Sequence, residues 1–136
     1  MKNNLLIDLE ERLVRYRSRT YAGRIHDKRM CDAADDTFPP GCVLLKDTGF
    51  QGVELENVLT YQPKKKPRKQ ALSAAEQAEN TMISRIRILV EHVIAGVKRC
   101  RIVHEVLRNT QAHFDDLVME IACGLHNFRT ALRYNA

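Results

Sequence analysis

The feature that most constrains the fold is a long amphipathic helix in the second half of the chain. Ser73 is followed three residues later by Glu76, which forms a capping box and marks the start of a helix. After it, apolar residues recur every three or four positions in a stripe about 100° wide. They are Ile83, Ile86, Val90, Val93, Ile94 and Val97. The spacing predicts a helix from Ser73 to about Lys98 or Cys100, packed on the rest of the protein through this stripe.

The first half of the chain contains short apolar runs that are typical of strands. Residues 4–8 and 12–17 predict a β-hairpin, although their acidic start is also compatible with a helix. Residues 43–46 predict a strand that is buried, since the run lacks alternation, and residues 57–61 predict another. A turn is expected at residues 20–23.

Two further helices are expected. One begins near His26 and Asp27, where an acidic residue favours a helix N-terminus, and runs to about Asp35, before Pro39-Pro40-Gly41. The last covers about residues 114–132, with Leu117, Ile121, Leu125 and Phe128 at the spacing of core residues. With 136 residues, the chain has the length of one α/β domain. We divide it into a strand-rich part (1–62), a basic linker (63–72) and a helical part (73–136).

Charge and cysteine content narrow the class of protein. The net charge is +5, and five of the six residues in 64–69 are basic, which favours a polyanionic partner over a small acidic substrate. A solvated helix face would explain the same charge. The four cysteines form no Cys-x-x-Cys pair and suit a reduced, cytosolic protein. Cys100 with His104 and Cys123 with His126 have helical spacing, which allows a zinc site but favours two core-facing pairs.

One face of the long helix carries charged groups suited to phosphoryl transfer. Arg87, Glu91 and Lys98 lie within about 40° of one another at 100° per residue. A carboxylate between two cations suits a metal ligand whose neighbours bind phosphate oxygens. Asp47, at the end of the apolar run 42–46, is a second carboxylate at the edge of a sheet where ligands bind.

Five short segments occur in an order that points to a known family. They are residues 22–28, 45–52, 63–68, 84–87 with 90–92, and 123–129. Together they resemble the DDE transposases of bacterial insertion sequences, in the branch related to Harbinger-type elements. The resemblance covers nearly the whole chain.

The resemblance implies an RNase H-like fold, a mixed sheet with flanking helices, in which three acids converge on two Mg²⁺ (or Mn²⁺) ions. It implies that Asp47 is the second acid, in an Asp-x-Gly-Phe motif, and that Glu91 is the third, in an Arg-x3-Glu-x6-Lys signature. His26 and Asp27 would start a helix or lie behind the metal ligands. The residues implied to contact DNA phosphates at the transposon ends are Arg87, Lys98, Lys64, Lys65, Lys66 and Arg68.

The chain departs from the family pattern at several points. Ser84 stands where the family signature has a tyrosine. The first catalytic acid, in an Asp-Gly-Thr-like motif on the first strand, has no counterpart, and neither has the family's N-terminal helical DNA-binding region. Asp8 is the nearest substitute, but its strand corresponds to the one after the catalytic strand. We therefore expect an N-terminally truncated fold that lacks the central first strand, leaving two strand edges without partners.

The expected function is metal-dependent DNA cleavage and strand transfer by the intact enzyme, with this chain inactive alone. The expected partners are DNA and either intact transposase or a separately encoded N-terminal part, with no membrane and no small-molecule substrate. The expected location is the bacterial cytoplasm, at the nucleoid. The alternative is a non-catalytic fragment that binds DNA or transposase and inhibits it. In the least specific interpretation, the chain is a basic α/β domain in which Glu91 only forms an intrahelical salt bridge.

Overall fold

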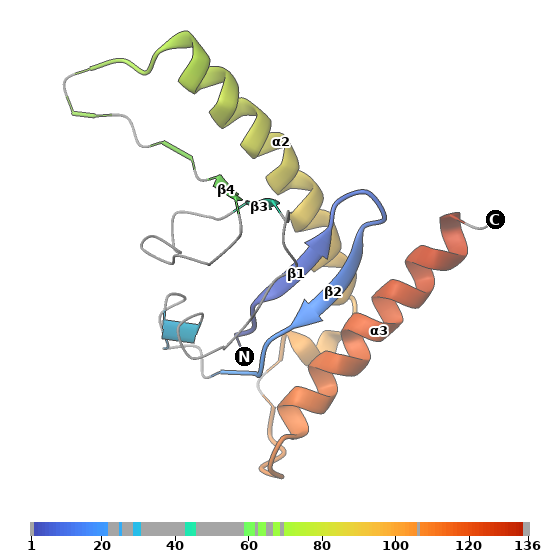
Figure 1. Cartoon of the computed structure of the whole chain (residues 1–136). Helices are drawn as coiled ribbons and strands as arrows, with labels where there is room; N and C mark the ends of the chain where they lie inside the picture. Colours follow the sequence, from blue (N-terminus) through green and yellow to red (C-terminus); the bar gives the residue numbers. More distant parts are fainter. Residues whose placement is uncertain are drawn as a thin grey trace. The chain divides into compact units, whose positions relative to one another are not determined.

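The described part of the computed structural model contains four strands, two long helices and one short 3-10 helix (Figure 1). It comprises residues 2–21, 25, 29–30, 43–45, 59–61, 63–64, 67–68, 70–105 and 107–134. The chain divides into one unit of residues 1–25 and 88–136 and another of residues 26–87. The mixed α/β class predicted from the sequence is confirmed.

The first unit begins with the predicted hairpin, whose turn is built by Asp8. Strand β1 (Leu5–Asp8) pairs antiparallel with β2 (Leu13–Arg17). The Asp8 carboxylate accepts the backbone N–H groups of Glu10 at 3.0 Å and Glu11 at 3.1 Å, as in an Asx turn. Arg12 completes the turn with a φ of 57°, in the left-handed region. A bridge between Lys2 and Tyr21 extends the pairing beyond the strands.

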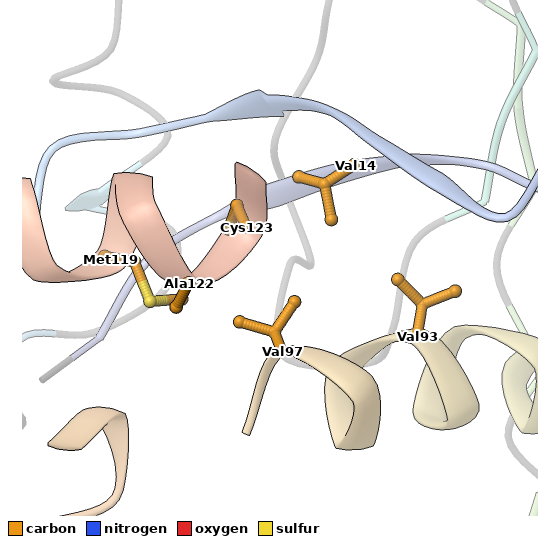
Figure 2. Close-up of a cluster of buried hydrophobic side chains, with 6 residues drawn as sticks. All are labelled: Val14, Val93, Val97, Met119, Ala122 and Cys123. Atoms are coloured by element: carbon orange, nitrogen blue, oxygen red, sulfur yellow. The ribbon is translucent and has the colours of Figure 1, made fainter. Parts of the chain in front are cut away.

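Helix α3 (Phe114–Tyr134) lies along β2 and shares a core with the hairpin and the C-terminal part of α2 (Ala74–Val97). Figure 2 shows this core, in which side chains of α2 point toward those of β2 and α3. Its members are Val14, Val93, Val97, Met119, Ala122 and Cys123. Partly buried Leu5, Ile7, Cys100 and Val103 pack against it, the last at the end of the 3-10 helix η2 (Arg101–Val103).

Helix α2 forms as its sequence predicts. The Ser73 hydroxyl accepts the N–H of Glu76 at 3.2 Å, and the Glu76 carboxylate accepts the N–H of Ser73 at 3.0 Å, so the capping box is complete. The predicted stripe is the buried side, since Ile83, Val93 and Val97 are all less than 10% exposed. The last helical residue is Val97, and the N–H of Lys98 still bonds to the carbonyl of Ile94 at 2.9 Å.

The second unit contains a short parallel strand pair. Strand β3 (Val43–Leu45) pairs with β4 (Leu59–Tyr61), with Val43 opposite Leu59. Both strands lie where the sequence predicted them, but Val43 is 60% exposed, so the predicted burial of this run is wrong at Val43. Arg29 and Met30 are helical. The other residues of the predicted helix near Asp27, and residues 22–23 of the predicted turn, lie outside the described residues.

The face of α3 that packs on the core is not the predicted one. The sequence predicted burial of Leu117, Ile121, Leu125 and Phe128, but all four are between 46% and 63% exposed. The buried residues are instead Val118, Met119, Ala122, Cys123 and His126. The position of the helix was predicted correctly and its rotation wrongly, because Ala122, Cys123 and His126 make inner contacts beside Val118 and Met119.

Candidate functional site

The charged face of α2 is exposed to solvent along its length. Glu91 borders the apolar stripe, a position at which partial burial is expected, but it is exposed, as are Arg87 and Lys98. Arg87 belongs to the second unit and the other two residues to the first, but α2 is one continuous helix through this division. Among the residues that the structure describes, the Glu91 carboxylate has no hydrogen bond or ion pair. The intrahelical salt bridge of the least specific interpretation is therefore not formed with Arg87.

The end of α2 that carries Lys98 is held by side chains of α3. Arg129 donates from Nη2 to the carbonyl oxygen of Gly96 at 3.1 Å, which satisfies a carbonyl in the last helical turn. The His126 ring packs directly against Gly96, where an added Cβ would lie 2.3 Å from Nδ1. A glycine is needed at this position because the two helices approach so closely.

The same segment of α3 also forms hydrogen bonds with the backbone of the hairpin. Asn127 donates from Nδ2 to the carbonyl of Val14 and accepts its N–H at Oδ1, both at 2.8 Å. The amide thus mimics a neighbouring strand along the outer edge of β2. His126 Nε2 lies 3.0 Å from the carbonyl oxygen of Arg12 in the turn. These contacts give His126, Asn127 and Arg129 structural roles.

Asp116 is a structural carboxylate that sequence reasoning missed. It accepts the N–H of Thr20 at 2.7 Å and an Arg17 guanidinium N–H at 3.1 Å. Partial burial acts to raise the pKa of Asp116, but the hydrogen bonds from Thr20 and Arg17 outweigh it, and the pKa is lowered. Two adjacent acids at a helix start, Asp115 and Asp116, were the available indication in the sequence.

The Asp8 carboxylate is committed to the hairpin. Besides the two backbone N–H groups it accepts a bond from Arg15 Nη2 at 3.2 Å, and these interactions lower its pKa, chiefly through the backbone hydrogen bond from Glu11. A carboxylate engaged in this way would have to leave the turn to bind a metal ion. The structure therefore gives Asp8 a local role.

The basic linker is partly tied to the start of α2. The Lys64 ammonium lies 3.7 Å from Glu76 and 3.9 Å from Glu79, and its backbone bonds to the Asn80 side chain through both N–H and carbonyl groups. Phosphate would compete with these carboxylates for Lys64. Arg68 is exposed. Lys65 and Lys66 lie outside the described residues.

The expected acid cluster cannot be assembled from the part of the chain that is described. Asp47, His26 and Asp27 all fall outside it. Among the described residues no three His, Cys, Asp or Glu side chains stand close enough to share a metal ion. The Cys–His pairs of the zinc alternative are likewise in no such group among the described residues. Cys123 is buried with a pKa raised by that burial, as suits a core thiol, whereas His104 is exposed rather than core-facing.

Comparison with known proteins decides the family. The model of the DDE superfamily endonuclease family matches residues 4–127, which include every candidate site residue named above. The chain belongs to this family. It is also 32% identical over 111 residues to a probable transposase for insertion sequence element IS702 from Microchaete diplosiphon. The DDE-type insertion-sequence transposase predicted from the motifs is thereby confirmed.

The match to this relative is partial in length. The aligned part covers 82% of this chain and 40% of the relative, so the chain spans less than half of the transposase it matches. No solved structure matches the chain. No helix in the described segments is long and apolar enough to cross a bilayer.

Proposed function

We propose that this chain is part of the catalytic domain of an insertion-sequence transposase. The intact enzyme would cleave DNA phosphodiester bonds and transfer strands at the transposon ends, in the bacterial cytoplasm at the nucleoid. This chain alone would be inactive, because the first catalytic acid has no counterpart in it. The family match over residues 4–127 carries this proposal, since it includes both Asp47 and the Arg87, Glu91 and Lys98 face.

The donor chemistry of the proposed ligands fits a hard divalent cation. Glu91 supplies an exposed carboxylate without an ion-pair partner among the described residues, and Asp47 would supply a second. Mg²⁺ or Mn²⁺ prefers such oxygen ligands to thiols or imidazoles. Held by these residues, two such ions would activate the attacking oxygen and stabilise the leaving one. Three acids are expected in the intact enzyme, so Asp47 and Glu91 would be an incomplete set.

The cations of α2 would position the DNA. Along the helix, Arg87 precedes Glu91 by about 6 Å and Lys98 follows it by about 10 Å. An exposed guanidinium and ammonium on either side of a metal-binding carboxylate would hold the phosphates that flank the reacting one. Lys65, Lys66 and Arg68 would add contacts to the backbone of the same DNA, whereas Lys64 would contribute only after release from Glu76 and Glu79.

The missing strand would join two small sheets into one. Among the described strands, β1 pairs only with β2, and β3 pairs only with β4. Two-stranded sheets are marginal on their own. In the RNase H-like fold that we propose for the intact enzyme, a central strand carrying the first acid would pair with both β1 and β3. An N-terminal segment or a separate polypeptide would supply this strand.

The proposal is tested first by sequencing upstream of the Met1 codon. We expect a reading frame, in frame or shifted by one, that encodes a strand with an Asp-Gly-Thr-like motif. The two products are then combined with Mg²⁺ and a DNA fragment carrying the transposon end. Cleavage should require both products and be lost in Glu91→Gln, but not in the matched control Glu105→Gln, whose side chain is also an exposed acid. Cleavage that survives Glu91→Gln would refute the assignment.

A second function rests on the exposed cations alone. This function needs no metal ion, since Arg68, Arg87 and Lys98 all lie at the surface. It would then bind transposon ends or intact transposase and inhibit transposition. The affinity for DNA should then fall steeply as the salt concentration rises, and Glu91→Gln should leave it unchanged. Lys98→Gln should lower the steepness of the plot of log binding constant against log salt concentration by about one unit. Arg85→Gln, on the opposite side of α2, should change this slope less.

A further inference from the structure

The segment that joins α2 to η2 carries positive charge that is not balanced locally. Residues 92–104 contain no Asp or Glu, but they contain Lys98, Arg99 and Arg101. All three side chains are exposed, and none of them has an ion pair or a hydrogen bond with another residue that the structure describes. We name these three residues the junction cations.

Two other arginines of the same unit show the contrast. Arg15 lies 3.2 Å from the Asp8 carboxylate and also pairs with Glu11. Arg17 lies 3.1 Å from the Asp116 carboxylate. The positive charge of these arginines is balanced by acids of the chain itself, whereas the charge of the junction cations is not balanced within the described residues.

The backbone of this segment is fixed by hydrogen bonds and by the core. The N–H of Cys100 bonds to the carbonyl of Val97 at 3.2 Å, and the N–H of Val103 bonds to the carbonyl of Cys100 at 2.9 Å. Cys100 and Val103 also pack against the core that contains Val97. Since every third residue from 97 to 103 faces the core, the residues between them are turned to solvent. Side chains on a fixed backbone lose less conformational freedom on binding than side chains of a loop that must first be ordered.

Hydrogen bonding to the end of α2 does not account for the two arginines. Basic side chains near a helix C-terminus often donate to its last carbonyl groups. In this chain Arg129 performs that role, since it donates to the Gly96 carbonyl at 3.1 Å. The side chains of Arg99 and Arg101 donate to no carbonyl of the described residues. Their N–H groups therefore remain free for an external acceptor.

We propose that the junction cations bind the phosphate backbone of duplex DNA, so that Arg99 and Arg101 extend the contact assigned above to Lys98. This inference rests on the proposed function of the chain as part of a DNA-cleaving enzyme. The three residues lie within four positions, a span of at most about 11 Å. Duplex DNA carries one phosphate charge per about 1.7 Å of its axis, so one stretch of backbone reaches all three cations. Phosphate contacts position DNA without reading its sequence.

The experiment measures the affinity of the full chain for a duplex of unrelated sequence, without divalent metal, at a series of salt concentrations. Each phosphate contact adds about 0.9 to the steepness of the plot of log binding constant against log salt concentration. Arg99→Gln and Arg101→Gln should each lower this slope by about 0.9, and the double variant by about 1.8. Between about 50 and 200 mM salt, the wild type should then lose about twelvefold more affinity than the double variant.

Two matched variants separate this site from the net charge of the chain. Arg15→Gln removes one positive charge from an exposed arginine that is already paired, so it should leave the slope unchanged. Arg99→Lys with Arg101→Lys keeps both charges and should keep the wild-type slope, because lysine also binds phosphate. The junction side chains are exposed and unpaired among the described residues, so the fold should survive these changes. An unchanged slope in Arg99→Gln and Arg101→Gln, or an equal change in Arg15→Gln, would overturn the proposal.

Failure of this inference is distinguishable from failure of the proposed function. The binding assay contains no metal ion, whereas the proposed function is tested by cleavage that depends on Glu91. If Glu91→Gln abolishes cleavage but Arg99→Gln and Arg101→Gln leave the salt dependence of binding unchanged, the function stands and the site is refuted. A wild-type chain that binds no duplex would also refute the site.

Discussion

Gly96 provides the sharpest test of the way α3 packs on α2. Gly96→Ala would normally stabilise a helix interior by about 1 kcal/mol, because alanine has the higher helix propensity. Here the added Cβ would lie 2.3 Å from Nδ1 and 2.7 Å from Cε1 of His126. The His126 ring is 8% exposed and held at Arg12, so it cannot move aside without losing that contact.

The structure sets the expected magnitude. Overpacking of a buried site costs about 2 kcal/mol, and loss of the hydrogen bond between His126 and the Arg12 carbonyl costs about 1 kcal/mol more. After the gain in helix propensity, the free energy of unfolding should fall by about 2 kcal/mol. With a urea m-value of about 1.5 kcal/mol/M, the unfolding midpoint should fall by about 1.3 M.

Two further variants separate the clash from other causes. In a His126→Ala background the obstacle is gone, so Gly96→Ala should raise stability by about 1 kcal/mol, a reversal of sign. Gly124→Ala is the matched control, since no heavy atom lies within 4 Å of its added Cβ, and it should stabilise the chain. If Gly96→Ala stabilises the wild type as Gly124→Ala does, the packing of His126 on Gly96 is refuted.

Three other residues give direct predictions. Asn127→Ala removes both hydrogen bonds to the Val14 backbone and should cost about 2 kcal/mol, with faster hydrogen exchange at the Val14 amide. The pKa of Asp116 is lowered on folding from its ordinary value of 3.8, so its stabilisation is present above that pH and is lost as the pH falls below it. The free energy of unfolding should therefore fall less on acidification in Asp116→Asn than in the wild type. Ser73→Ala should cost about 1 kcal/mol, and it should raise the pKa of Glu76 only in part, because the backbone N–H of residue 73, the larger cause of the lowering, remains; NMR titration measures this.

Local sequence chemistry was enough to place the long elements. The capping box at Ser73 fixed the start of α2, and a single apolar stripe fixed its buried side. The hairpin followed from two apolar runs separated by polar residues. Each of these depends on neighbours within a few positions, which a sequence displays directly. The parallel pairing of β3 with β4 depends on distant residues, and no local pattern predicted it.

The orientation of α3 was not predictable from apolar spacing, because the more apolar of its faces is not the one that packs on the core. Leu117 and Phe128 belong to the larger and more apolar side, so periodicity favoured their burial. The side that is buried instead carries Ala122, His126 and Asn127, which suit close helix approach and hydrogen bonds to backbone. Hydrophobic periodicity ranks faces by transfer free energy, and it does not detect a face chosen by shape and polar pairing.

The candidate site shows the same division between local and distant information. The common face of Arg87, Glu91 and Lys98 follows from helical spacing; α2 carries Arg87 and Glu91, and Lys98 directly follows its last residue. A metal centre needs carboxylates from separate segments, and in the described residues no three His, Cys, Asp or Glu side chains stand close enough to share an ion. What the structure adds is the support behind Lys98, where Arg129 bonds to Gly96 and His126 packs beside it. If Lys98 binds phosphate as proposed, its position depends on this helix end, so Arg129 and His126 would act on the site through α2.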